Sequence, residues 1–293
     1  MDGIIVINKS KGCTSHDVVN KVKKIFKTKV GHTGTLDPNA TGVLPILIGQ
    51  GTKLSYYLIE HDKEYICTLK LGQKRDTADS EGNIIEEKEV KENCLEKDNV
   101  NNILKTFLGK QSQIPPIYSA IKVNGKKLYE YARKGESVEI QPRTIEIYNI
   151  ELVSINKEEK EICFKVKCSK GTYIRSLCES IAEKLGTVGY MKELERTMVG
   201  NFNIKDSISV EELEENKESE KFIKKHFITI EDFFENKSKT KIVLDNKRLG
   251  HFLNGVKLTY NLDDGLYRIY NEENKFIGIG NVTDKMLKRE IVL

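Results

Sequence analysis

The sequence contains no tryptophan and lacks the motifs of the commonest metal and nucleotide sites. Its six cysteines include no C-x-x-C pair and its five histidines form no H-E-x-x-H motif, so we expect reduced, mostly buried thiols and no metal site. A single reactive cysteine is the alternative interpretation. The phosphate-loop motif G-x-x-x-x-G-K-S/T and a complete dinucleotide fingerprint are also missing, which argues against the familiar nucleotide-binding classes.

Long apolar runs are absent as well. No stretch approaches the roughly 18–20 apolar residues that a membrane span needs. The first residues, MDGIIVINKSKG, lack the basic region that precedes the apolar core of a signal peptide. We therefore expect a cytoplasmic protein without a membrane segment.

Positive charge is concentrated in two segments, although the net charge is only +4. Residues 1–53 contain eight Lys and Arg against three Asp and Glu, and residues 105–148 contain eight against four. Residues 211–220, EELEENKESE, contain six acids and one lysine, which is typical of a solvated surface. Two separated basic segments predict a polyanionic partner such as a nucleic acid.

Strand and helix patterns are interspersed without strict β-α-β alternation. The hydrophobic pattern predicts strands at 3–9, 43–49, 64–72, 84–90, 144–155 and from 161 onward. It predicts helices at 14–26, 52–61, 94–109 and 176–186, with a polar loop at 73–83. Thr14 and Asp17 have the spacing of a capping box at the start of the first helix. An α+β fold with a mixed, largely antiparallel sheet fits this order better than a doubly wound fold.

The chain is expected to divide into two domains. The pattern weakens beyond about residue 205, and FFENKSKTK (233–241) resembles a linker. Residues 239–293 contain short strand patterns and turns at 254–255, 263–265 and 271–275, which indicates a small β-rich domain. We therefore assign residues 1–236 to the larger domain and 239–293 to the smaller.

One stretch, GHTGTLDPNATGVLPI (31–46), holds a single acid, Asp37, among glycines and threonines. A turn-rich connection that begins a turn at Asp37 and Pro38 is one interpretation. The other is a loop that presents the carboxylate to a ligand, because glycine lets the backbone approach closely. By contrast, DTADSEG (76–82) lacks acids at the first and twelfth positions of a calcium loop, and a polar turn is the simpler interpretation.

An ionised carboxylate in a closed pocket needs a cationic partner. Arg175, in KGTYIRS, is the best candidate, because a guanidinium pairs bidentately and keeps its proton; a surface arginine is the alternative. Tyr65 and Tyr173 lie at the edges of apolar strand patterns. They either pack in the core or sandwich a planar base.

Four segments together resemble the TruB family of tRNA pseudouridine synthases. They are the 31–46 stretch, KEYICTLKLG (63–72), PPIYSAIKVNGKKLYEYARKG (115–135) and SKGTYIRSL (169–177), and the similarity runs from about residue 3 to 202. The last 55 residues more loosely resemble a PUA-type RNA-binding domain. Residues 111–140 match the family's insertion that grips the T-loop.

The resemblance implies isomerisation of uridine 55 in the TΨC loop of tRNA, without a cofactor. The N1–C1′ bond breaks, the uracil turns and it rejoins through C5. Asp37 matches the catalytic aspartate, and its chemical path is left open. Tyr65 matches the tyrosine that stacks on the base and is a candidate for proton transfer at C5, and Arg175 matches the partner of the aspartate. The remaining matches near the substrate are Tyr173, Leu194, His32 and Lys9.

The insertion also supplies candidates for contacts with RNA phosphates. They are Lys122, Lys126, Lys127, Arg133 and Lys134. Departures from the family's pattern fall at Arg75, Ser180 and Glu195. The implied partner is the T-arm of tRNA, bound by a monomer without an obligate protein partner. A guide-RNA-dependent enzyme acting on ribosomal RNA and an RNA chaperone are the alternatives.

Overall fold

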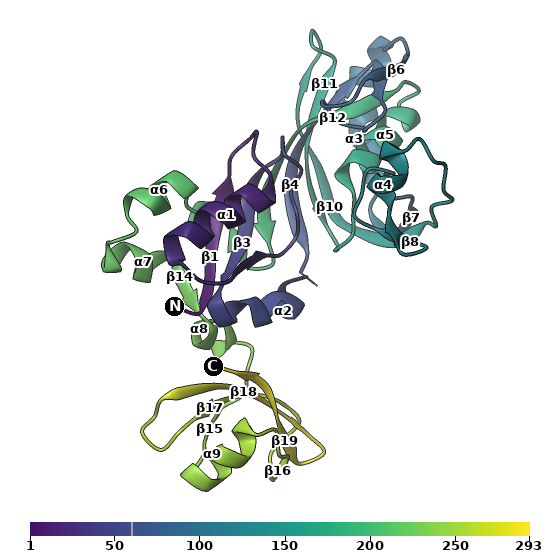
Figure 1. Ribbon diagram of the computed structural model, residues 1–293. Helices are drawn as coiled ribbons and strands as arrows, with labels where there is room; N and C mark the ends of the chain where they lie inside the picture. The colour runs from purple at the N-terminus through teal and green to yellow at the C-terminus, as the bar shows by residue number, and fades with distance from the viewer. Residues whose placement is uncertain (60) are drawn as a thin grey trace.

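A mixed sheet of ten strands forms the centre of the larger lobe in the computed structural model, which describes residues 1–59 and 61–293 (Figure 1). The strand order is β14-β1-β3-β12-β4-β11-β10-β7, with β2 beside β3 and β13 beside β12. The β12–β3 pair is parallel, whereas the other neighbouring pairs are antiparallel. The predicted α+β fold with a largely antiparallel sheet is confirmed. The strands are β1 (Gly3–Lys9), β2 (Val30–His32), β3 (Thr41–Ile48), β4 (Lys63–Leu71), β7 (Gly109–Gln113), β10 (Arg143–Asn156), β11 (Glu161–Cys168), β12 (Gly189–Val199), β13 (Phe202–Asn203) and β14 (Phe227–Thr229).

Both faces of the sheet are covered near β1 and β3, which explains their continuous apolar sequences. Ile5 and Ile7 pack in a large core with α1 (Ser15–Phe26) and α5 (Ile174–Lys184). Ile4 and Val6 point to the opposite face and pack in a second core. The two cores therefore hold β1 from both faces of the sheet.

The helices α1 and α5 follow the predicted signals at their ends. Thr14 and Asp17 form the capping box at the start of α1. The α5 helix begins at Ile174, two residues before the predicted start, and Gly186 follows it with a φ of +86°. That conformation strongly favours glycine and stops the helix where the sequence predicts. The other predicted helices are found as η1 (Gly49–Leu54) with α2 (Ser55–Ile59), and as η2 (Glu92–Leu95) with α3 (Lys97–Lys105).

The insertion between β7 and β10 contains a short hairpin. Its strands are β8 (Lys122–Val123) and β9 (Lys126–Lys127), joined by Asn124 and Gly125, which both have positive φ as in a type I′ turn. The predicted hairpin turn is confirmed. The short helix α4 (Leu128–Arg133) follows and was not expected.

Several segments differ from the prediction. Gln73–Arg75 belongs to a strand, β5, that pairs with β6 (Ile84–Glu87), so only the rest of 73–83 is a loop. The central strand β12 was not predicted. Beyond residue 205 the chain forms η3 (Ile204–Asp206), α6 (Val210–Glu215), α7 (Glu220–His226) and α8 (Ile230–Glu235). The linker interpretation of 233–241 is wrong at its start, because Phe233 and Phe234 are buried in α8.

The C-terminal part of the chain contains a five-stranded sheet of order β15-β17-β18-β19-β16 (Figure 1). Its strands are β15 (Lys241–Val243), β16 (Leu258–Thr259), β17 (Gly265–Tyr270), β18 (Phe276–Thr283) and β19 (Met286–Val292). The turn predicted at 254–255 is confirmed, and it follows a helix that was not predicted, α9 (Asn246–Leu253). Ile279 and Ile291 pack in the same core as Phe233 and Phe234, so the terminal sheet rests on α8. Of the helices in the described residues, none is long and apolar enough to cross a membrane.

Candidate active site

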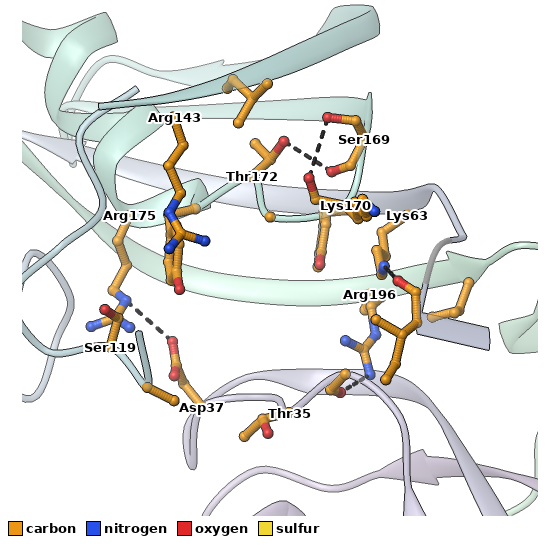
Figure 2. A pocket seen from close by; sticks show the side chains of 18 of the residues that line it. Thr35, Asp37, Lys63, Ser119, Arg143, Ser169, Lys170, Thr172, Arg175 and Arg196 are labelled. Atoms are coloured by element: carbon orange, nitrogen blue, oxygen red, sulfur yellow. Dashed lines mark hydrogen bonds and ion pairs between the residues drawn. The ribbon is translucent and has the colours of Figure 1, made fainter. Parts of the chain in front are cut away.

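A cavity of about 790 Å³ opens where the 31–46 stretch faces α5 and the insertion (Figure 2). Its wall combines carboxylate, guanidinium, ammonium and phenol groups. The lining residues used below are Asp37, Tyr65, Tyr118, Tyr129, Arg143, Tyr173, Arg175 and Arg196. The volume lies within the range of roughly 300–1,000 Å³ that is usual for small-molecule sites.

Buried polar groups hold the loop that carries Asp37. The Ser15 hydroxyl, at the first turn of α1, bonds both the N–H and the C=O of Leu36, at 2.9 and 3.2 Å. The Lys9 ammonium is fully buried and donates to the carbonyl oxygens of Ser10, Cys13 and Pro38, at 3.0, 2.7 and 3.0 Å. All three of its N–H donors are therefore engaged. The structure places Lys9 beneath the loop as a brace, outside the cavity lining.

Asp37 and Arg175 form the pair that the sequence predicts. Arg175 Nε lies 3.3 Å from Asp37 Oδ2, and the arginine side chain is only 9% exposed whereas that of Asp37 is 36% exposed. Two backbone carbonyls, of Thr77 and Tyr118, accept hydrogen bonds from the guanidinium at 3.3 and 3.0 Å. The Asp37 carboxylate is therefore accessible from the cavity, whereas the buried Arg175 guanidinium is held by the two backbone carbonyls.

Asp79 is a second acidic partner of Arg175, and sequence reasoning missed it. Its Oδ2 lies 3.6 Å from Arg175 Nη1, and its Oδ1 accepts hydrogen bonds from the Thr77 hydroxyl and the Glu81 N–H. Arg75, a departure from the family's pattern, donates to the carbonyl oxygens of Ser80 and Gly82 in the same turn. The 76–82 turn, dismissed as a calcium site, therefore holds the arginine that pairs with Asp37.

The two predicted tyrosines both line the cavity. Burial raises the pKa of Tyr65 to about 12, an effect that the charge of Arg196 partly offsets. Tyr65 is therefore a phenol at neutral pH. Tyr173 precedes α5, and the Gln113 side chain bonds its backbone N–H and C=O at 2.8 and 3.0 Å.

Leu194 and His32 lie near Asp37 in different ways. Leu194, on β12, lines two smaller recesses that Asp37 also lines. His32, on β2, is half-buried, and its Nδ1 has no hydrogen-bond partner among the described residues. Burial, then the charges of Arg196 and His16, lower the pKa of His32 from its ordinary 6.5. The imidazole is neutral at pH 7 and keeps a polar atom for a ligand.

The His32 pKa predicts a pH dependence of stability. A histidine whose pKa is lower in the folded state binds its proton mainly in the unfolded state, so stability falls as the pH drops below the unfolded value of 6.5. We expect His32→Gln to lose less stability than the wild type between about pH 7.5 and about pH 5. Urea unfolding at both pH values measures this, with the exposed His251→Gln as control. Equal losses in wild type and His32→Gln would contradict the assignment.

The basic residues of the insertion lie outside the cavity lining. Lys126 pairs with Glu136 at 2.5 Å and lies over the Tyr131 ring, whereas Lys127 lies over Tyr129. Lys122, Arg133 and Lys134 are exposed. The insertion reaches the cavity through other residues, chiefly Tyr118 and Tyr129.

Sequence reasoning also missed four cationic residues of the cavity wall: Lys63, Arg143, Lys170 and Arg196 (Figure 2). Arg143 immediately precedes the predicted strand 144–155, and Lys63 and Lys170 lie inside the quoted segments KEYICTLKLG and SKGTYIRSL, so these three lie close to recognised signals. Arg196 directly follows Glu195, one of the departures from the family's pattern. In the described part of the chain, no group of three or more His, Cys, Asp and Glu side chains is placed to hold a metal ion.

Comparisons with solved structures first define the fold. A chain in the crystal structure of a Cbf5-Nop10-Gar1 complex is 26% identical, with a TM-score of 0.67, over 96% of this chain and 78% of that one. A chain in the structure of an H/ACA RNP bound to a substrate RNA containing 2′-deoxyuridine has a TM-score of 0.65 at 24% identity, over 96% of this chain and 78% of that one. The latter shows the fold alone.

The family follows from three family models and from relatives. Residues 23–174 match the TruB family pseudouridylate synthase N-terminal domain, 175–235 the tRNA pseudouridylate synthase B C-terminal domain, and 240–289 the pseudouridine synthase II TruB C-terminal domain. The tRNA pseudouridine synthase B of Clostridium kluyveri is 44% identical over 98% of both chains, and that of Clostridium tetani 45% over 98% of both. The chain belongs to the TruB family of pseudouridylate synthases, which makes it an isomerase.

Proposed function

We propose that this protein converts uridine 55 in the TΨC loop of tRNA to pseudouridine, with Asp37 as its essential group and without a cofactor. The Asp37–Arg175 pair at the wall of a nucleoside-sized cavity carries the proposal. The names of its relatives, tRNA pseudouridine synthase B, support tRNA as the substrate. We also propose that it acts in the cytoplasm as a monomer, without an obligate protein partner.

The cavity requires the uridine to leave its stack. Extruding a base costs on the order of a few kcal/mol, which contacts with RNA phosphates can offset. Arg143 is exposed and projects into the cavity in Figure 2, where a phosphate beside the extruded nucleotide would enter. Tyr65 and Tyr173 offer ring faces for the base, and Leu194 an apolar wall.

The roles of the reacting groups follow from their surroundings. Arg175 stabilises the negative charge of Asp37, which then acts on the base or on the sugar at C1′ or C2′. Tyr65 is proposed to transfer the proton at C5 once the base has turned. His32 keeps one free ring nitrogen for the extruded nucleotide. Lys9 acts indirectly, by holding the loop under Asp37.

The domain division belongs to the proposal as well. Residues 1–236 would form the synthase domain, with the T-loop-gripping insertion at 111–140, and residues 239–293 the PUA-like RNA-binding domain. Support comes from the separate five-stranded sheet of the terminal part and from the family model that begins at residue 240.

The direct test uses the purified chain alone with an unmodified tRNA transcript. Pseudouridine is mapped by carbodiimide treatment and primer extension, and a transcript with cytidine at the T-loop position is the control. We expect one modified position, at the T-loop uridine. Modification elsewhere, or none without added protein or guide RNA, would refute the proposal. Refolding of tRNA without modification would support the chaperone instead.

Phosphate contacts by the insertion predict a change in salt dependence. Lys126→Ala with Lys127→Ala should weaken tRNA binding and reduce the slope of log Kd against log salt by about 1 for each lysine that contacts a phosphate. Filter binding over a salt series measures both effects. Lys221→Ala with Lys225→Ala, at exposed sites on α7, is the matched control. A slope equal to that of the wild type would remove Lys126 and Lys127 from the interface.

A further inference from the structure

Arg196 is a buried guanidinium without an acidic partner. Its exposed fraction is 1%, which places it among the largest fully buried side chains. Arg175 has two carboxylates, whereas no carboxylate among residues 1–59 and 61–293 pairs with Arg196. Burying an uncompensated cation costs folding free energy. Its position therefore needs an explanation beyond packing.

Arg196 lies between the strand that follows the Asp37 loop and the strand that carries Tyr65. On β12, Arg196 lies opposite Gly42 of β3 on one side and opposite Tyr65 of β4 on the other. Its Nε donates to the Val43 carbonyl at 2.8 Å and its Nη2 to the Gly34 carbonyl at 2.9 Å. These two carbonyls lie on either side of Asp37 in the sequence. One side chain therefore closes the Asp37 loop and faces Tyr65.

Tyr65 is the β4 neighbour of Arg196, and both residues line the cavity. Arg196 and Tyr65 occupy facing register positions on β12 and β4, and the charge of Arg196 lowers the pKa of Tyr65, against the larger effect of burial. Two other groups act on the hydroxyl, Cys168 from β11 and Asp37 from the loop, and both raise its pKa. Arg196 is thus the cation that favours the ionised phenol. Arg175, Lys63 and Lys170 line the same cavity.

We propose that Arg196 is a positioning residue that acts on the reaction through Tyr65, by stabilising the negative charge on the tyrosine oxygen at the C5 proton transfer. The inference rests on the proposed function. In that step the C5–H bond breaks and its electron pair forms the C5–C6 double bond of the uracil. The π pair of the N1–C6 double bond moves to N1, which takes a proton from water, and the C5 proton bonds to the Tyr65 oxygen. Tyr65 is a phenol before the step, so it first gives its own proton to water, and the neighbouring Arg196 guanidinium lowers the energy of the phenolate that then accepts the C5 proton.

The test compares Arg196→Gln, which removes the charge, with Arg196→Lys, which keeps it but loses the planar fork. The single-turnover rate is measured by pseudouridine formation, and the Kd for tRNA is measured in an Asp37→Asn background. We expect Arg196→Gln to lower the rate by about 100-fold, with Kd changed less than about 3-fold. Arg196→Lys should recover part of the rate. Lys157→Gln removes an exposed cation that pairs with Glu96 at 2.8 Å, away from the cavity lining, and should leave the rate unchanged.

A second substitution separates the electrostatic role from a purely structural one. Placing 3-fluorotyrosine at position 65 alone makes the phenol more acidic, which should raise the rates of the wild type and of Arg196→Gln. Equal losses in Arg196→Gln and Arg196→Lys, without recovery by fluorotyrosine, would overturn the proposal and leave Arg196 as a loop brace. If Arg196→Gln does not fold, an unchanged rate in fluorinated wild type still overturns it. A wild type that makes no pseudouridine would instead refute the proposed function.

Discussion

Replacing Asp37 by Asn is expected to lower pseudouridine formation by at least about four orders of magnitude, as the loss of an essential catalytic group does. The amide keeps the shape of the carboxylate and removes its charge. Arg175 retains Asp79 and two carbonyl acceptors, so the cavity wall should keep its form. Affinity for tRNA is set mainly by phosphate contacts and should change little.

Single-turnover modification and filter binding of Asp37→Asn test these two expectations separately. Asp206→Asn, at an exposed site, controls for the loss of one negative charge elsewhere. If Asp37→Asn lost tRNA binding together with activity, the loop would be a structural turn rather than a reactive site. That result would restore the simpler interpretation of the 31–46 stretch.

Replacing Arg175 by Gln should lower both activity and stability. The substitution removes a 9% exposed guanidinium from between Asp37 and Asp79 and leaves the two carboxylates facing each other. Breaking a buried ion pair by deleting one partner costs about 3–5 kcal/mol, and the partial exposure of Asp37 places the expected loss near the lower end of that range. Urea unfolding measures the stability, and single-turnover modification the activity.

A second substitution distinguishes the two effects of Arg175. Adding Asp79→Asn to Arg175→Gln removes one of the facing carboxylates, so part of the stability should return while activity stays low. Arg175→Lys is the matched control for charge, because an ammonium cannot reproduce the fork that meets Asp37, Asp79 and two carbonyls. An active Arg175→Gln would show that Asp37 needs no cation.

Local signals predicted the parts of the fold and site that depend on short segments. The capping box at Thr14 and Asp17 specifies the start of α1 through two hydrogen bonds within four residues. Likewise, Asn124 and Gly125 specify the hairpin through backbone angles that few other residues adopt. The Asp37–Arg175 pair joins distant segments, but each belongs to a segment that resembles the family.

The parts that escaped prediction depend on tertiary neighbours. The strand β12 has the sequence GYMKELERTMV, in which Met, Lys, Glu and Leu favour a helix, and β3 and β4 on its two sides impose the strand. Asp79 and Arg196 escaped for the same reason. Their partners lie 96 and 131 residues away, at Arg175 and Tyr65, so no local pattern reveals them.

The terminal sheet rests on α8, and this packing decides how the contribution of the sheet to tRNA binding can be measured. Ile279 and Ile291 cover Phe233 and Phe234, Tyr57 donates to Glu290 at 2.8 Å, and Lys53 donates to the Val292 carbonyl at 2.5 Å. Deleting residues 239–293 would therefore strip a cover from the core that also holds β1 and β3. The tRNA affinity of the truncated enzyme would then reflect lost core packing as well as lost RNA contacts. Charge substitutions on the outer face of the terminal sheet isolate the RNA contacts.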